Sequence, residues 1–178
     1  MQALVLLALL SLPEPGEGVR QTLHPEVQKR IAALEEKMRA RRRRVVLNSG
    51  ARQGDPGDSL HNQRLAADVE VPGLLSVEVA RELLDVGFSC AIPYFDRRGR
   101  PCRMAHGDLR HTEFASGPYA PGSGEKHCPA LAVSRTGGCH NDNKGQWQYF
   151  NAWPKRLGRS RIAELKPEQR RQTLGSAP

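Results

Sequence analysis

Long apolar segments are absent from this 178-residue chain, and aromatic residues make up only 5% of it. No apolar run approaches the roughly 20 residues that a membrane-spanning helix needs, so the sequence predicts no membrane span. The chain also lacks a C-x-x-C pair, which argues against a zinc module held by four thiolates. The sequence therefore argues against a helical membrane protein and against a metal site made only of cysteines.

Lysine and arginine outnumber aspartate and glutamate by 27 to 19, which gives a formal net charge of +8 at pH 7. A basic chain attracts anionic partners, but no nucleic-acid recognition motif accompanies the charge, so we expect no specific nucleic-acid partner. With 38% hydrophobic residues, 17 glycines and 13 prolines, the composition predicts one loop-rich α+β domain. The sequence gives no oligomeric state.

An apolar run from Ala3 to Leu12 ends at Pro13 and is followed by the small residues Gly16 and Gly18. This pattern is typical of a secretory signal peptide over residues 1–18, and a buried N-terminal helix is the alternative.

The four cysteines form the even set expected of an exported protein with disulfides: Cys90, Cys102, Cys128 and Cys139. Four cysteines allow three pairings, and the sequence leaves all three open. We expect export to the periplasm or the extracellular space.

Apolar periodicity predicts helices and strands over residues 19–112, which we take as the core. The expected elements are a helix that starts at Pro25, a strand over 45–47, a strand over 65–71, a helix over 76–86 capped by Ser76, and strands over 88–95 and 103–110. Periodicity fails after Thr112. Residues 113–178 are expected to form a loop-rich, basic and irregular C-terminal extension.

Three residues within this core form a candidate metal site. His61 and Asp68 are seven residues apart, a rise of ~10 Å on one helix, which is too far to share an ion. A histidine in a loop and an aspartate on the outer face of the next strand can converge, however. His106 lies on a later strand and shares a face with Asp108, opposite Ala105. Two histidines and one carboxylate, with a coordination position left open, are the ligand set of a catalytic zinc site.

The pattern Ser59-x-His61-x-x-Arg64-x-Ala66-x-Asp68 resembles the S-x-H-x-x-G-x-A-x-D signature of the zinc D-Ala-D-Ala carboxypeptidase / L-alanyl-D-glutamate endopeptidase family. These peptidoglycan peptidases share their fold with the hedgehog signalling domain. The stretches 45–52 and 104–108 resemble the family's "SGYRS" segment and its H-x-D branch. The resemblance covers about residues 22–110.

The resemblance implies a small antiparallel sheet flanked by helices, with zinc bound by His61, Asp68 and His106. It implies that Arg52 holds a substrate carboxylate or the developing oxyanion and that Ser59 supports the site. Arg64 replaces the family glycine.

The catalytic acid that many members carry three residues before the second histidine is Arg103 in this chain. Because an arginine cannot accept a proton from water, the base has to be Asp108, Asp96 or another acid. Asp108 has the alternative of orienting a ligand histidine, and Asp96 that of a solvated turn residue.

The sequence thus predicts a zinc peptidase, either a carboxypeptidase or an endopeptidase, that acts on the peptide stems of peptidoglycan in cell-wall remodelling or, as an endolysin delivered by a phage, in lysis. The alternative is a non-catalytic zinc-binding relative that serves as a wall-binding or structural protein. The bond that is cut stays open.

Overall fold

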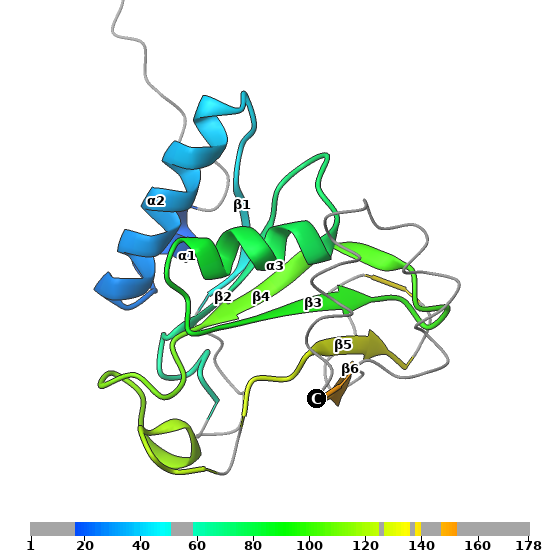
Figure 1. Cartoon of the computed structure of the whole chain (residues 1–178). Coiled ribbons are helices and arrows are strands. Elements are labelled where there is room, and N and C mark those ends of the chain that lie inside the picture. Colours follow the sequence, from blue (N-terminus) through cyan, green and yellow to red (C-terminus); the bar gives the residue numbers. More distant parts are fainter. Residues whose placement is uncertain (1–16, 51–58, 125–126, 136–137, 140–146, 153–178) are drawn as a thin grey trace, which may run out of the picture.

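The computed structural model describes residues 17–50, 59–124, 127–135, 138–139 and 147–152 (Figure 1). Within these residues there are three helices and one six-stranded sheet, which confirms the expected α+β class. The helices are α1 (Glu17–Gln21), α2 (Pro25–Ala40) and α3 (Ser76–Asp85). The strands are β1 (Val46–Ser49), β2 (Ala66–Glu70), β3 (Cys90–Phe95), β4 (Pro101–Asp108), β5 (Leu131–Ser134) and β6 (Trp147–Phe150). A 3-10 turn covers Gly117–Tyr119.

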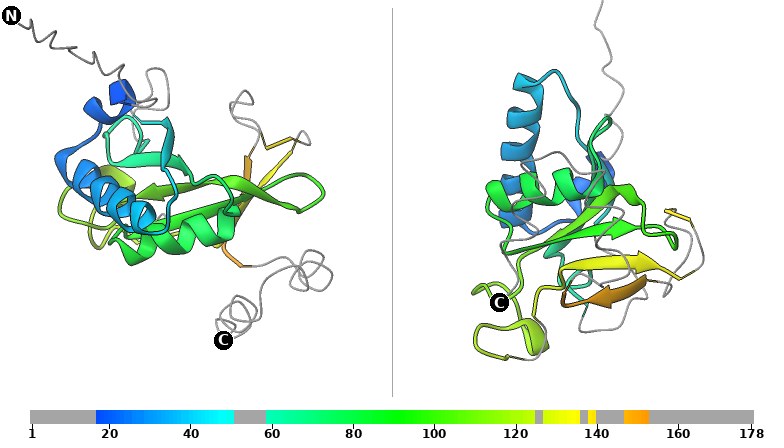
Figure 2. Two further views of the ribbon diagram at one scale, coloured as in Figure 1. Left: turned by 90° about the horizontal axis from the view of Figure 1, so that it is seen from above. Right: turned by 45° about the vertical axis from the view of Figure 1, so that its right-hand side comes forward.

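The strands are ordered β1-β2-β4-β3-β5-β6. All neighbouring strands are antiparallel except β3 and β5, which run parallel, so the sheet is mixed and not antiparallel throughout as expected. The last two strands come from the segment after residue 112 that was expected to be irregular (Figure 2). Strands of four residues among glycines and prolines are too short for their alternation to stand out in the sequence.

Helix α2 forms where the apolar stripe predicts it. Pro25 is its first residue, and the Nδ1 of His24 accepts a hydrogen bond from the backbone N–H of Glu26, 3.2 Å away. All four residues of the stripe are fully buried: Val27, Ile31, Leu34 and Met38. They join one hydrophobic cluster with α3 and the inner face of the sheet.

Helix α3 lies across β3 and β4 (Figure 1), and a glycine lets it approach closely. A Cβ on Gly107 would lie 3.1 Å from Phe88 and 3.2 Å from Leu83. The capping position lies one residue earlier than expected, because Leu75 is the N-cap and Ser76 is the first residue of the helix. The hydroxyl of Ser76 donates to the carbonyl of Tyr94, 2.7 Å away, and so ties α3 to β3.

The opposite face of the sheet carries a second buried cluster that includes Ile92, Tyr94 and Met104. The cysteines Cys90 and Cys102 belong to it as well. Cys90 is bonded to Cys128 and Cys102 to Cys139, which selects one of the three pairings left open by the sequence. Both disulfides therefore tie the segment around β5 to β3 and β4. Among the described residues no helix is long and apolar enough to cross a membrane.

Candidate metal centre

The register of the sheet places two of the expected ligands side by side. Asp68 on β2 faces His106 on β4 directly, and Ser49 on β1 faces Asp68 from the other side. Successive side chains of a strand point to opposite faces. Ala105 and Gly107 face α3, so Asp68 and His106 project from the other face of the sheet. The predicted shared face of Asp68 and His106 is thus confirmed.

His61 comes from a tight turn between the loop after β1 and strand β2. The backbone N–H of Leu65 donates to the carbonyl of Leu60 at 2.8 Å, and the N–H of His61 donates to the hydroxyl of Ser59 at 3.2 Å. Arg64 closes the turn with a φ of 63°, the left-handed conformation that glycine adopts most easily. Arg64 stands where the signature that residues 59–68 resemble has glycine, and its backbone conformation is one that favours glycine.

The three side chains converge on one point. One ligand atom from each of His61, Asp68 and His106 lies within 4.8 Å of the others, and all three residues are buried. The Nε2 of His61 is 3.9 Å from Oδ2 of Asp68, and the Nδ1 of His106 is 3.1 Å from Oδ1 of Asp68. This arrangement could hold a metal ion.

Each histidine directs one ring nitrogen into the cluster and the other to an acceptor outside it. The Nδ1 of His61 lies 2.8 Å from the carbonyl oxygen of Gly50, and the Nε2 of His106 lies 2.9 Å from Oδ2 of Asp108. A carbonyl or a carboxylate can only accept, so these outer nitrogens carry the protons. The inner nitrogens are then the ones that can bind a metal, as in most protein metal sites.

The carboxylate of Asp68 is fully buried and is held by hydroxyl groups. The hydroxyl of Ser49 donates to Oδ2, and the hydroxyl of Tyr94 lies 3.2 Å from Oδ1. The ring of Tyr94 in turn stacks on Trp147 of β6 with centroids 4.4 Å apart. Four strands, β1, β2, β3 and β6, therefore fix this one ligand.

Asp108 is fully buried, and both of its oxygens accept hydrogen bonds. Oδ1 accepts from the backbone N–H and the Nε of Arg110 at 3.0 and 2.9 Å, and Oδ2 accepts from NH2 of Arg110 at 2.6 Å and from His106. Burial raises the pKa of Asp108, but His106 and Arg110 outweigh it and lower the pKa to about 2. These contacts favour the orienting role, and the role of general base stays a prediction.

The same contacts act on His106. Burial lowers its pKa, but the hydrogen bonds to Asp108 and Asp68 outweigh the burial and raise the pKa to about 9 in the metal-free protein. A bound metal ion requires Nδ1 to be deprotonated, so the ion has to displace a proton at this site.

The other expected site residues divide into three cases. Ser59 holds the turn that carries His61, in keeping with a supporting role. Asp96 is in the β3–β4 hairpin, four residues beyond Ile92, which faces His106, and its carboxylate binds Arg100 at 2.6 Å. It is buried and not solvated: burial raises its pKa, but the bonds from Arg100 lower the pKa below its usual range. Arg52 lies outside the described residues.

Several residues of the centre were not assigned a role from the sequence: Ser49, Gly50, Tyr94 and Arg110. The first two lie in the stretch that resembles the family. For Arg110, alternation from Asp108 indicates the face. For Tyr94, two residues from Ile92, alternation could have indicated it but was not used. No local signal gave their partners. Arg103, which stands in the place of the family acid, is exposed to solvent.

In comparisons with known proteins, no protein-family model, no curated protein and no solved structure matches this chain. The candidate centre therefore has to be interpreted from its own geometry.

Proposed function

We propose that the protein is a zinc-dependent peptidase that hydrolyses the peptide stems or cross-links of bacterial peptidoglycan. The observation that carries the proposal is the buried group His61, Asp68 and His106, with one ligand atom from each within 4.8 Å of the others. Two imidazoles and one carboxylate suit zinc better than calcium or magnesium, which prefer ligand sets made only of oxygen. Three protein ligands also leave a coordination position for a substrate, as catalytic zinc sites do.

Zinc in this position would supply Lewis acidity toward a peptide carbonyl and toward water, whose pKa falls to about 7 in such sites. The residues of the chain fix the ligand geometry in advance. Asp68 and His106 are anchored by the ladder between β2 and β4, and Gly50 and Asp108 set the orientation of the two imidazole rings. Preorganisation of this kind is what a metal-assisted hydrolysis requires of the protein.

The proposed substrate follows from the resemblance of residues 59–68 to peptidoglycan peptidases and is supported by the charge of the chain. A net charge of +8 attracts the protein to an anionic cell wall and raises the rate of encounter. Two disulfides fit an exported protein, either secreted by its cell or delivered to the wall by a phage. A terminal D-Ala-D-Ala bond and an internal stem bond suit the centre equally.

A second candidate function is non-catalytic zinc binding, in a wall-binding or structural protein. Its support is the position of the acids. Asp108, the acid nearest to His106 in the sequence, has both oxygens bonded to other side chains, and Arg103 is no base. Under this alternative the protein binds zinc and wall peptides but releases no product.

One experiment separates the two functions. Purified muropeptides are incubated with the protein, with and without a zinc chelator, and the products are identified by mass spectrometry. Peptide products that disappear with chelator support the peptidase and identify the bond. Stoichiometric zinc with no product from any muropeptide favours the binding protein. Products that persist at full yield in chelator, or a protein that binds no zinc, would overturn the assignment to a zinc enzyme.

A further inference from the structure

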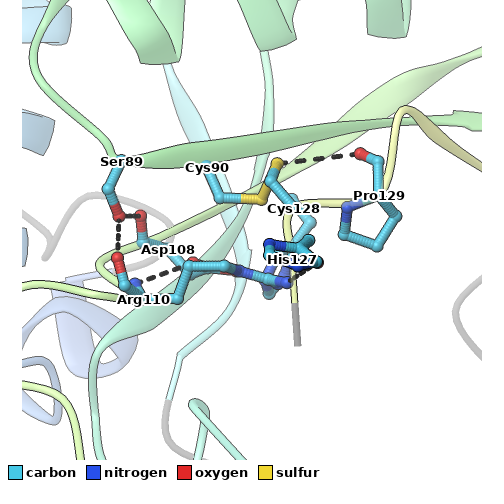
Figure 3. Close-up of a disulfide and its surroundings, with 8 residues drawn as sticks. Ser89, Cys90, Asp108, Arg110, His127, Cys128 and Pro129 are labelled. Carbon is cyan, nitrogen blue, oxygen red and sulfur yellow. Dashed lines mark hydrogen bonds and ion pairs between the residues drawn. A yellow bond between two sulfur atoms is a disulfide. The ribbon is translucent and has the colours of Figure 1, made fainter. Parts of the chain in front are cut away.

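A disulfide lies next to Asp108, the carboxylate that supports His106 from outside the metal cluster. Cys90 on β3 is the direct cross-strand neighbour of Asp108 on β4, and both are fully buried. Cys90 is bonded to Cys128, which belongs to the connection between β4 and β5 (Figure 3). The hydroxyl of Ser89, the residue before Cys90, lies 3.1 Å from the carbonyl of Asp108. Ser89 and Cys90 thus both contact the backbone of Asp108.

The other end of the disulfide fixes a backbone acceptor. His127, the residue before Cys128, offers its carbonyl oxygen to NH1 of Arg110 at 2.8 Å (Figure 3). The guanidinium of Arg110 uses its Nε and NH2 groups on Asp108, at 2.9 and 2.6 Å. It is therefore held between the carbonyl of His127 and the carboxylate of Asp108, and its side chain is only 8% exposed.

The contacts continue to the expected metal ligand. Oδ2 of Asp108 accepts the Nε2–H of His106 at 2.9 Å, and this bond leaves Nδ1 directed at Asp68. We propose that the Cys90–Cys128 disulfide is a positioning element of the metal centre, which holds His106 in its binding orientation through His127, Arg110 and Asp108. The proposal rests on the proposed function only in taking His106 as a ligand.

The disulfide is needed for this positioning because His127 and its partner Arg110 are far apart in the sequence. Arg110 is 17 residues away, and the side chain of His127 is exposed to solvent. The covalent bond at Cys128 ties the next residue directly to β3. Without it, the carbonyl of His127 has fewer constraints, Arg110 loses a fixed acceptor, and the hold of Asp108 on His106 weakens.

The second disulfide provides a matched control. Cys90 and Cys128 are 38 residues apart, and Cys102 and Cys139 are 37 apart, so the chain entropy removed from the unfolded state is nearly equal. Each disulfide joins one strand of the β3–β4 pair to the segment around β5: Cys90 is on β3 and Cys102 on β4. Cys102 faces no residue of the chain of contacts from His127 to His106, since it lies at the other end of β4, next to Pro101, which pairs with Phe95.

The test compares four full-length proteins: the wild type, C90A/C128A, C102A/C139A and Arg110→Lys. Zinc affinity is measured by competition with a chelator. The exchange of the His106 Nε2–H with solvent is measured by NMR on the metal-free proteins, which does not require zinc binding. Lysine keeps the charge of Arg110, but its ammonium group cannot reproduce the planar guanidinium that bonds the His127 carbonyl and the Asp108 carboxylate together. The variant therefore isolates the geometric part of the contact.

We expect C90A/C128A and Arg110→Lys to bind zinc roughly 10–100-fold more weakly, the range for lost outer-sphere contacts, and to exchange the His106 proton about tenfold faster. C102A/C139A should keep the wild-type exchange of the His106 proton while losing comparable stability. Its zinc affinity should fall by less than that of C90A/C128A, because the link from Cys102 to the centre is the cluster that it shares with Tyr94, which holds Asp68. In the triple variant C90A/C128A/R110K, the loss should equal that of Arg110→Lys alone, because both changes interrupt one pathway.

Equal losses for the two disulfide variants would overturn the proposal and reduce the Cys90–Cys128 bond to a general staple. Additive losses in the triple variant would overturn the pathway through Arg110. If C90A/C128A does not fold, Arg110→Lys alone decides, since unchanged zinc affinity and proton exchange in that variant contradict the proposal. If the wild type binds no zinc, the proposed function fails, and the proton exchange of His106 still tests the pathway.

Discussion

Asp68 and His106 face each other across the ladder between β2 and β4, with Nδ1 of His106 3.1 Å from Oδ1 of Asp68. Two of the three expected metal ligands are thus fixed by backbone pairing in the middle of the sheet. The third, His61, depends on the turn that follows Ser59 and on the carbonyl of Gly50.

The first prediction is one zinc ion per chain. His61→Ala and His106→Ala each remove a ligand, so we expect both variants to lose zinc affinity by more than about 100-fold, beyond the range for outer contacts. Metal analysis after equilibrium dialysis measures the stoichiometry. His111→Asn is the control, since His111 lies outside the cluster and asparagine tolerates its φ of 59°. Undiminished zinc in both alanine variants would end the assignment.

The second prediction separates the two roles of Asp108. Asparagine nearly preserves the shape of Asp108 but holds Arg110 and His106 less strongly. If Asp108 orients His106, Asp108→Asn lowers zinc affinity by roughly 10–100-fold, and activity returns with excess zinc. If Asp108 is the general base, turnover falls by about 10²–10⁴-fold at saturating zinc. The buried contacts favour the first result, and a zinc titration of the variant measures it. Full activity without added zinc would eliminate both roles.

The third prediction concerns Gly50. A Cβ at this position would lie 3.0 Å from side-chain atoms of both Leu23 and Val19, so in Gly50→Ala either these side chains or the Gly50 backbone, whose carbonyl holds His61, has to move. We expect zinc affinity to fall by about tenfold. Gly18→Ala is the matched control, because a Cβ there meets nothing within 4 Å. Chelator competition on the two variants makes the comparison, and equal affinities would show that the Gly50 carbonyl is dispensable.

The fourth prediction is a pH dependence of stability that arises from Glu82 on α3. Its carboxylate binds Lys37 and Arg41 of α2 at 2.7 and 2.6 Å. Burial raises the pKa of Glu82, but the two cations outweigh it and lower the pKa below its usual value of 4.5. A lowered folded-state pKa contributes stability above pH 4.5, and this contribution is lost as the pH falls through the folded-state pKa.

Glu82→Gln should therefore cost about 1–2 kcal/mol at pH 7, because both cations are partly exposed, and progressively less below pH 4.5. Urea unfolding across this range provides the measurement. Asp85→Asn removes an exposed partner of Lys37 and should cost less than about 0.5 kcal/mol. A cost for Glu82→Gln that is the same at pH 3 and pH 7 would contradict the assignment.

The fifth prediction is that the protein from its native source is oxidised and processed. Mass spectrometry should find the pairs Cys90–Cys128 and Cys102–Cys139 and the loss of an N-terminal segment. Reduction should destabilise the fold by about 4 kcal/mol per bond in the chain-entropy model, for loops of 38 and 37 residues. An intact Met1 with four free thiols would place the protein in a reducing compartment. Residues 1–16 lie outside the described part of the chain, so cleavage stays a prediction.

Apolar periodicity along the chain was enough to predict the most regular elements, and residue spacing was enough to predict the three members of the metal cluster. The stripe of α2 lies in the core, and alternation along β2 and β4 put Asp68 and His106 on the same face. Alternation did not reveal that Asp68 is fully buried, since it gives the face of a strand but not what covers that face. Ser49 and Tyr94 supply the hydrogen bonds that make this burial possible, and both come from other strands.

The pairing of the cysteines, the extension of the sheet by β5 and β6, and the contacts that hold the ligands could be read only from the folded chain. The Cys90–Cys128 bond joins residues 38 positions apart, and the carbonyl of His127 reaches Arg110 across 17. Apolar residues that recur every 2 or 3.6 positions share one face of a strand or helix, so the sequence indicates which face is buried. These periods do not encode which distant segment covers that face. The pairing of strands and the outer supports of the metal centre arise from such distant contacts, and so they became visible only in the fold.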